Sequence, residues 1–483
     1  MTSELSAQLK LCASMPGEPE VDRPRPERLV AGNPRRETWN VVDALLASGS
    51  RLYCGIWRCE PGHWRIAFGP HEHELFTVLA GRCRVHGADG SVQEVGSGEA
   101  LAIARETGGI VPKGQHEVKE AVLLCQIAAG LPLRAQGEVL PSTPGRLSLA
   151  KRVPHGVVGV ISPFNFPLIL GIRSVAPALA LGNAVVLKPD PRTPVSGGVI
   201  MAEAFRRAGL PDGLLQVLPG DAEAGEVLVS DARVPMIAFT GSPTVGRRIG
   251  ELAGRHLKKV SLELGGANNL VVLDDADLDA AASAWFHQGQ ICMASNRVLV
   301  HEAVAEGLKQ RLVLKAQHLP VGDGASGQVA LGPMIDARQL GRFDAMVQES
   351  IQAGAKLEAG GSHEGLCYQP TVLSGVKPGM RTFDDEPFGP LVNLVTFGSD
   401  EEAVALANHS QGGLAAAVIG RDVARALAIG ERLNAGMVHI NDQTVADEPH
   451  VPFGGRGASG NGGRHGGPAN WEEFTQWQWV TIK

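Results

Sequence analysis

The hydrophobic and polar positions divide the chain into two parts of different character. From Trp39 to about Ala104, short alternating runs such as "LYCGIWRCEPG", "RCRVHGADG" and "SVQEVGSGEALAIA" are separated by glycine turns. Alternation with a period of two is typical of half-buried strands, so these runs predict a series of β-hairpins. After about residue 105, apolar runs such as "VVGVIS" and "AVVLKP" alternate with longer alanine-rich stretches. This rhythm predicts a parallel sheet covered by helices.

Composition places the chain among globular proteins that act on small molecules. Its 483 residues are 44% hydrophobic, which is ample for large cores, and the net charge of −7 comes without a long basic run. We therefore expect no nucleic-acid partner and no membrane partner. The N-terminus carries neither a basic region nor an apolar region of a signal peptide, so we expect a cytoplasmic protein.

The cysteines give no sign of a disulfide framework or a zinc knuckle. There are seven, an odd number without a CxxC pair: Cys12, Cys54, Cys59, Cys83, Cys125, Cys292 and Cys367. In a reducing compartment most are expected to be small buried side chains. Cys292 stands apart because "HQGQICMASNR" sets it among small and polar residues, after an alanine-rich run that predicts a helix.

Two motifs place polar side chains at the ends of predicted strands. In "GVVGVISPFNFP" a β-rich run ends in a proline turn that carries Asn165, whose carboxamide is suited to an oxyanion, although a structural asparagine is the commoner case. In "NAVVLKPDP" a strand runs into Lys188 at its carboxyl end, where ligands bind in open α/β sheets. A surface lysine is the alternative.

Two further motifs have the same ambiguity. "FTGSPTVGRRIG" follows a predicted strand and opens a helix, an arrangement in which helix N-terminal amides can approach a phosphate, although it is not GxGxxG. "VSLELGGANNLVV" places Glu263 in an apolar strand, where desolvation raises a carboxyl pKa toward that of a useful general base. A carboxylate in an ion pair at the sheet edge is the alternative for Glu263.

Taken in order, the motifs resemble the aldehyde dehydrogenase superfamily from about Arg105 to Lys483. They are "SPFNFP", "LKPD", "FTGS", "LELGG", "GQIC", "EPFGP" and "PFGGRGASG", and the wording around them is most similar to the bacterial benzaldehyde dehydrogenase branch. The resemblance implies an α/β fold with a Rossmann-type cofactor domain and an α/β catalytic domain. The predicted parts are a lead-in at 1–36, a β segment at 37–104, a cofactor domain at 105–262 with an oligomerisation arm at 136–154, a catalytic domain at 263–455, and a tail with an oligomerisation strand at 456–483.

The resemblance also implies the chemistry of the site. Cys292 matches the nucleophile that attacks an aldehyde, Asn165 matches the oxyanion donor, and Glu263 matches the base that activates water to hydrolyse the thioester. The product is a carboxylic acid, and no metal is needed. A benzaldehyde-like aromatic aldehyde is the expected substrate.

For the cofactor, the resemblance implies a set of binding residues: Ile161, Ser162, Lys188, Gly220, Gly225, Gly241, Ser242, Glu386 and Phe388. One position departs from the pattern. Many relatives that prefer NAD carry an acid three residues after the lysine, where this chain has Pro191. NAD and NADP therefore both remain candidates. The arm and the terminal strand "FTQWQWVTIK" resemble elements that pair between subunits, which implies a homodimer or homotetramer.

Two stretches differ from the superfamily. Glu263 and Cys292 are 292 − 263 = 29 positions apart, about five residues fewer than in relatives, and five helical residues span about 7.5 Å. A shifted register there would turn Cys292 away from the site. In addition, the early helices of the superfamily are replaced by the β segment, which resembles a small cupin.

The cupin resemblance raises a metal site as a possibility to test. His71, His73 and Glu74 are candidate ligands, because a His-x-His on a strand places both rings on one face. His116 is the nearest later histidine, but it falls in a stretch that predicts a dehydrogenase helix. The ligand set is therefore incomplete, and we expect no metal. Besides an active dehydrogenase, two alternatives remain: an impaired dehydrogenase-fold scaffold, and a cupin-type metal enzyme or sensor.

Overall fold

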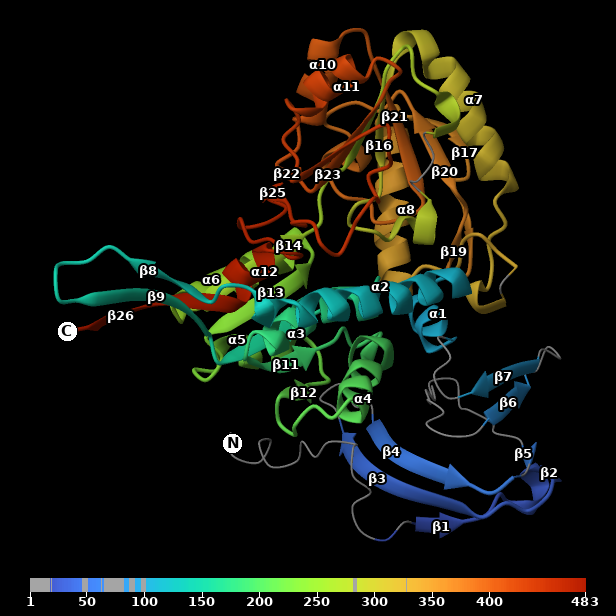
Figure 1. Cartoon of the computed structure of the whole chain (residues 1–483). Coiled ribbons are helices and arrows are strands. Elements are labelled where there is room, and N and C mark those ends of the chain that lie inside the picture. Colours follow the sequence, from blue (N-terminus) through green and yellow to red (C-terminus); the bar gives the residue numbers. More distant parts are fainter. Residues whose placement is uncertain are drawn as a thin grey trace. The chain divides into compact units, whose positions relative to one another are not determined.

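The computed structural model describes residue 18 and residues 20–45, 51–61, 63–64, 82–86, 92–96, 101–280, 285–326 and 328–483 (Figure 1). The chain forms two compact units, Met1–Thr77 and Val78–Lys483, which are considered separately. Among the described residues, no helix is both long and apolar enough to cross a lipid bilayer.

The N-terminal unit is built of antiparallel strands, as the alternating pattern predicts. One sheet has the order β1-β3-β4, and a second pairs β2 with β5. The elements are β1 (Glu20–Asp22), η2 (Pro26–Arg28), β2 (Leu29–Ala31), β3 (Arg36–Leu45), β4 (Arg51–Cys59) and β5 (His63–Trp64). The second unit begins with another hairpin, β6 (Arg82–His86) with β7 (Val92–Gly96).

The expectation that the β pattern continues through "EALAIA" is wrong. Residues Leu101–Thr107 form helix α1, and Val111–Ala129 form helix α2. Ile103 and Ala104 are almost fully buried, and Ile103 belongs to the same core as helix α3 (Pro167–Ala180). Leucine and alanine favour helix, and burial of one helical face against this core outweighs the alternation seen in the sequence.

The first α/β part is a parallel sheet of five strands in the order β12-β11-β10-β13-β14. The strands are β10 (Val157–Ile161), β11 (Ala184–Lys188), β12 (Leu215–Val217), β13 (Met236–Gly241) and β14 (Lys259–Leu264). The helices are α3 (Pro167–Ala180), η4 (Val195–Val199), α4 (Ile200–Arg207), α5 (Ala222–Ser230) and α6 (Pro243–Arg255). The βαβ rhythm predicted from the sequence is thus confirmed.

The second α/β part is a sheet of seven strands in the order β17-β20-β21-β16-β15-β23-β24, parallel except for the β17–β20 pair. Its strands are β15 (Asn269–Val272), β16 (Arg297–His301), β17 (Lys356–Ala359), β20 (Thr371–Ser374), β21 (Leu391–Phe397), β23 (Ala415–Ile419) and β24 (Met437–Ile440). Its helices are η7 (Gly324–Ser326), α7 (Glu302–His318), α8 (Ala337–Gln352), α9 (Arg381–Asp384), α10 (Asp400–Ala407) and α11 (Val423–Gly430). Short elements complete it: β18 (His363–Glu364), β19 (Cys367–Tyr368), β22 (Gly412–Gly413) and β25 (Arg456–Gly457). Helix α12 (Ala469–Phe474) instead packs against α3 of the first α/β part.

A separate sheet of three antiparallel strands, in the order β26-β9-β8, extends from the first α/β part (Figure 1). It consists of β8 (Gly137–Leu140) and β9 (Leu147–Pro154), which follow η3 (Leu131–Leu133), together with the C-terminal β26 (Thr475–Ile482). The predicted hairpin arm and terminal strand are therefore both present, and they pair with each other within one chain.

The prediction of a helix just before Cys292 is wrong for the residues that the structure describes there. They form two 3-10 turns, η5 (Leu278–Ala280) and η6 (Phe286–Gly289). His287 and Gln288 have left-handed backbones, with φ of 47° and 53°. The Gln288 amide donates to the carbonyls of Gly108 and Pro333, at 2.8 Å each. Residues Phe286–Gly289 thus form a tight, anchored turn just before Cys292.

Candidate active site

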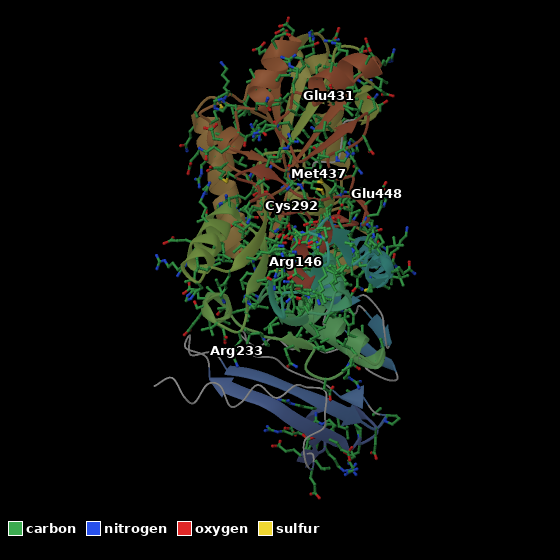
Figure 2. The ribbon with its side chains drawn as sticks, turned by 60° about the vertical axis from the view of Figure 1, so that its left-hand side comes forward. Arg146, Arg233, Cys292, Glu431, Met437 and Glu448 are labelled. Carbon is green, nitrogen blue, oxygen red and sulfur yellow. The ribbon has the colours of Figure 1, made fainter. Side chains whose placement is uncertain are left out.

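Cys292 lies on a turn between η6 and β16, at the contact between the two α/β parts (Figure 2). Its thiol is half-buried and packs against a small apolar cluster that includes Phe453, with Phe166 and Met437 beside it. The Asn268 side chain fixes the turn by donating to the Cys292 carbonyl at 2.6 Å. The loss of about five residues therefore leaves Cys292 facing the interior, on a turn held from both sides.

Asn165 approaches the same turn from the loop between β10 and α3. Its side-chain amide is buried and donates to the carbonyl of Gln290 at 3.0 Å. Pro163 and Pro167 flank the loop, and Pro167 is the first residue of α3, a position where proline is well tolerated. The Asn165 amide is thus held against Gln290, which lies two residues before Cys292 in the sequence.

Glu263 is the next-to-last residue of strand β14 and is 4% exposed. Within the described chain, neither of its carboxylate oxygens has a hydrogen-bond partner of good geometry. A Cβ added to Gly454 would lie 2.8 Å from Glu263 Oε1, so this glycine makes room for the carboxylate. Burial raises the pKa of Glu263 well above its usual value, although the charges of Arg464 and Arg173 oppose this rise.

Burial also raises the pKa of the Cys292 thiol, to about 12. The negative charge of Glu386 adds to this effect, while Arg173 acts against it. The thiol is therefore mainly protonated at neutral pH, and burial favours the protonated form of the Glu263 carboxyl as well. A reaction through the thiolate requires neighbouring positive charge.

Arg173 supplies such a charge from an otherwise apolar helix. It is nearly fully buried on α3, ion-pairs with Asp447, and stacks 4.3 Å from the ring centre of Phe453. Its Nη1 is buried without a partner among the described residues. Sequence reasoning did not single out this arginine, although a lone charge in "PLILGIRSVAPALA" was a usable signal.

The predicted cofactor residues of the first sheet gather at one edge. The parallel strands place Ile161 and Lys188 side by side in the β10–β11 register, with Gly241 at the end of β13. Ser242 is the N-cap of α6 and accepts from the Val245 amide at 3.4 Å. Gly220 has a φ of 150°, and Gly225 lies on α5 beside Ile161. This is the carboxyl edge of the sheet, where dinucleotides bind in folds of this kind.

Glu386 and Phe388 come from the second sheet and are held from the same side. Arg342 donates to the Glu386 carbonyl, and Gln339 donates to the Phe388 carbonyl, at 3.1 Å each. A Cβ added to Gly265 would lie 2.0 Å from Glu386 Oε2, so the carboxylate occupies space that only glycine leaves. Burial raises the pKa of Glu386 to about 8.

These residues fit a nicotinamide dinucleotide. Ser162 Oγ and Glu386 Oε1 are buried without partners in the described structure, so each has hydrogen-bonding capacity left for a ligand. Lys188 is almost fully buried, and its ammonium makes a single hydrogen bond, at 3.3 Å, to the Pro189 carbonyl. Buried polar atoms normally find partners, and ribose hydroxyls and phosphates would supply them here.

Most of the candidate metal ligands of the cupin-like segment fall outside the described residues. His71, His73 and Glu74 lie outside the described residues. His116 is exposed on helix α2, as its sequence context predicts. The described residues contain no group of three or more side chains suited to a metal ion.

The comparisons with known proteins agree with this geometry. The aldehyde dehydrogenase family model matches residues 98–480, and the EutQ-like cupin domain model matches residues 46–123. The chain is 54% identical to a vanillin dehydrogenase of an Amycolatopsis species, over 79% of this chain and 80% of that one. It is 55% identical to the NAD(+)-linked benzaldehyde dehydrogenase of Pseudomonas putida, over 78% and 79%.

Among solved structures, a salicylaldehyde dehydrogenase of Pseudomonas putida in complex with salicylaldehyde has a TM-score of 0.77 at 36% identity, over 80% of this chain and 81% of that one. A betaine aldehyde dehydrogenase of Staphylococcus aureus in complex with NAD+ also has a TM-score of 0.77, at 30% identity over 79% and 78%. The chain therefore belongs to the aldehyde dehydrogenase family. It is an NAD(P)-dependent enzyme with an additional cupin-like segment at its N-terminal side.

Proposed function

We propose that the protein oxidises an aromatic aldehyde to the carboxylic acid with NAD+, using Cys292 as the nucleophile. The observation that carries the proposal is the meeting of three groups from separate elements: the Cys292 turn, the Asn165 amide and the Glu263 carboxyl. The names of the benzaldehyde and vanillin dehydrogenases among the relatives support an aromatic substrate.

The surroundings of Cys292 suit an apolar aldehyde. Phe166 and Phe453 lie in the cluster around the thiol, with Ile291, Met293 and Val445. An aromatic ring in such surroundings gains both from leaving water and from contact with other rings. A charged or strongly hydrated aldehyde would lose its hydration without recovering it here.

In the first step, the Cys292 thiolate adds to the carbonyl carbon, and the former carbonyl oxygen becomes an anion. The Asn165 amide and the backbone N–H of Cys292 stabilise this oxyanion, since the amide has a second N–H besides the one that bonds Gln290. Bound NAD+ would supply the hydride acceptor, and loss of hydride from this adduct would leave a thioester on Cys292. Glu263 then takes a proton from water, the hydroxide attacks the thioester, and the acid and the thiol are released.

The residues at the two sheet edges hold the cofactor in this proposal. Lys188 would bind the adenosine ribose, the amides at Gly241 and Ser242 would hold the pyrophosphate, and Glu386 and Phe388 would hold the nicotinamide ribose. NAD+ is favoured because one of the relatives is named for NAD+ and a solved neighbour contains it. Pro191 leaves room for activity with NADP+ as well.

A homodimer or homotetramer in the cytoplasm completes the proposal. The three-stranded sheet of the arm and the terminal strand exposes large apolar side chains, among them Val139 (72% exposed) and Trp479 (67% exposed). Strands β8 and β26 are the edges of the three-stranded sheet, and open edges of this kind pair readily. The free thiols of Cys125, Cys292 and Cys367 are compatible with a reducing compartment.

The test is the formation of NADH or NADPH from benzaldehyde, vanillin and hexanal, with NAD+ and NADP+ in separate assays. We expect the highest kcat/KM for an aromatic aldehyde with NAD+. Cys292→Ala is expected to abolish turnover, and Cys125→Ala, which removes another free thiol, is the control. No turnover by the folded wild-type protein, or turnover that persists in Cys292→Ala, would contradict the proposal.

A further inference from the structure

Helix α2 carries an ion pair that is completely buried. Lys113 and Glu117 lie one helical turn apart, and their side chains are 0% exposed, with Nζ 2.5 Å from Oε1. A buried pair of this kind seldom adds net stability over apolar residues of similar size. Its presence inside the fold therefore requires another explanation.

The second oxygen of Glu117 points at the start of helix α3. Glu117 Oε2 accepts hydrogen bonds from the backbone N–H groups of Leu168 (3.0 Å) and Ile169 (3.3 Å). The N-cap residue of α3, Phe166, makes no capping bond with its own side chain. Glu117 therefore caps α3 from the neighbouring helix, which packs along it (Figure 1).

Lys113 holds the residue next to Asn165. Its Nζ lies 4.5 Å from the ring centre of Phe166, and it also contacts Thr107 Oγ1 at 3.4 Å. Phe166 also contacts His287, and the two rings meet edge-on with centroids 5.2 Å apart. His287 lies on η6, three residues before Gln290, the acceptor of the Asn165 amide.

These contacts hold the residues around Asn165, the oxyanion donor, from two sides. One side runs from Glu117 to the first turn of α3, and the other runs from Lys113 through Phe166 and His287 to the Cys292 turn. Burial lowers the pKa of His287 well below its usual range, so its ring stays neutral beside the Lys113 ammonium. Asn165 is thereby fixed relative to both the helix and the nucleophile.

We propose that Glu117 and Lys113 are positioning residues that hold Asn165 in register with Cys292, with Glu117 acting as an external cap on helix α3. The inference rests on the proposed roles of Asn165 and Cys292. It assigns no contact with the substrate to either member of the pair. If so, removing the cap should slow reactions that need the Asn165 donor more than it changes the reactivity of the Cys292 thiol.

The test compares two double variants that both remove the buried charges. Lys113→Met with Glu117→Gln keeps an oxygen acceptor at the helix start, and Lys113→Met with Glu117→Leu removes it. The assay is hydrolysis of 4-nitrophenyl acetate, in which Cys292 displaces 4-nitrophenolate and water then releases acetate. This reaction needs the oxyanion donor but no hydride transfer. We expect the leucine variant to be about tenfold slower than the glutamine variant, within the roughly 100-fold cost of a 1 Å misplacement.

Two further measurements separate positioning from a general loss of structure. Alkylation of Cys292 by iodoacetamide needs no oxyanion donor, so its rate should agree within about twofold between the two variants. In an Asn165→Ala background, the difference in ester hydrolysis should disappear, because the cap would then have no donor to position. If the leucine variant does not fold, Glu117→Asp provides the same comparison with wild type, because it keeps the charge and draws the oxygens away from α3.

Equal ester hydrolysis by the two variants would overturn the inference, and so would unequal alkylation or a difference that persists without Asn165. Each of these results can occur while the wild-type protein still oxidises benzaldehyde. Conversely, a capping effect on ester hydrolysis in a protein that oxidises no aldehyde would uphold the inference and contradict the proposed function. The two failures are therefore distinguishable.

Discussion

The side-chain amide of Asn165 donates to the carbonyl of Gln290 at 3.0 Å, which joins the loop before α3 to the turn that carries Cys292. This single bond relates the proposed oxyanion donor to the proposed nucleophile across 125 residues of sequence. The amide carries two N–H donors, so one can hold the Gln290 carbonyl while the other donates to the oxyanion.

Asn165→Ala should lower kcat for benzaldehyde by about 100-fold to 1,000-fold, the usual cost of losing one oxyanion donor. The KM for NAD+ should change by less than about threefold, because Asn165 lies outside the proposed cofactor contacts. Steady-state kinetics at saturating NAD+ measures both. A loss in kcat smaller than about fivefold would show that another group stabilises the oxyanion.

Arg173→Met should move the rising limb of the pH–rate profile to higher pH by about one unit. The arginine charge lowers the pKa of both Cys292 and Glu263, while Glu386, Asp447 and Glu263 raise that of Cys292. Both reacting groups must lose a proton to act, so removing the cation makes each harder to ionise at a given pH. The measurement is kcat/KM for benzaldehyde against pH, with Arg173→Lys as the control that keeps the charge. An unchanged limb in the methionine variant would exclude this electrostatic role.

Glu386→Gln should flatten the pH dependence of stability. Burial raises the pKa of Glu386 from 4.5 to about 8, so between these values the folded protein holds a proton that the unfolded chain has released. Its contribution to the free energy of unfolding is therefore present at low pH and is lost as the pH rises through this window. Urea unfolding between these two pH values should show a decline that is shallower in the variant by up to about 5 kcal/mol, at about 1.4 kcal/mol for each pH unit. An equal decline in both proteins would contradict a raised pKa for Glu386.

Trp479→Lys should weaken subunit association. The side chain is exposed on the edge strand β26, and it donates to Ser148 Oγ at 2.8 Å. A lysine there places charge on the apolar face that we propose lies between subunits. Light scattering during gel filtration should show a shift toward the monomer, with Lys483→Ala at the end of the chain as the control. A wild-type protein that is already monomeric would rule out the proposed assembly.

Much of the fold and of the candidate site could be predicted because the information is local. Strands β10, β11 and β14 are apolar runs that end in proline or glycine, so Lys188 and Glu263 fall where the sequence places them. The cysteine turn and the helix after "FTGS" are likewise short segments with a strong pattern. The pKa of Glu263 could be anticipated because its strand is apolar on both sides.

The parts that could not be predicted depend on contacts between distant segments. Arg173 pairs with Asp447, which is 274 residues away, so the helix pattern alone reads as apolar packing. The left-handed turn at His287 replaces an expected helix because Gln288 is anchored to Gly108 and Pro333. Residues 101–107 became a helix because their burial against α3 outweighs their alternating pattern. The part boundaries proposed from the sequence remain predictions.

The central claim is that Cys292 carries the acyl group and Glu263 activates the water that removes it. The most direct measurement is the mass of Glu263→Gln after mixing with benzaldehyde and NAD+, followed by analysis of the peptide that contains Cys292. We predict one burst of NADH, about equal to the number of active sites, and a benzoyl group on Cys292 that accumulates because its hydrolysis is slow. A burst without an adduct on that peptide, or a benzoyl group on any other residue, would contradict the account.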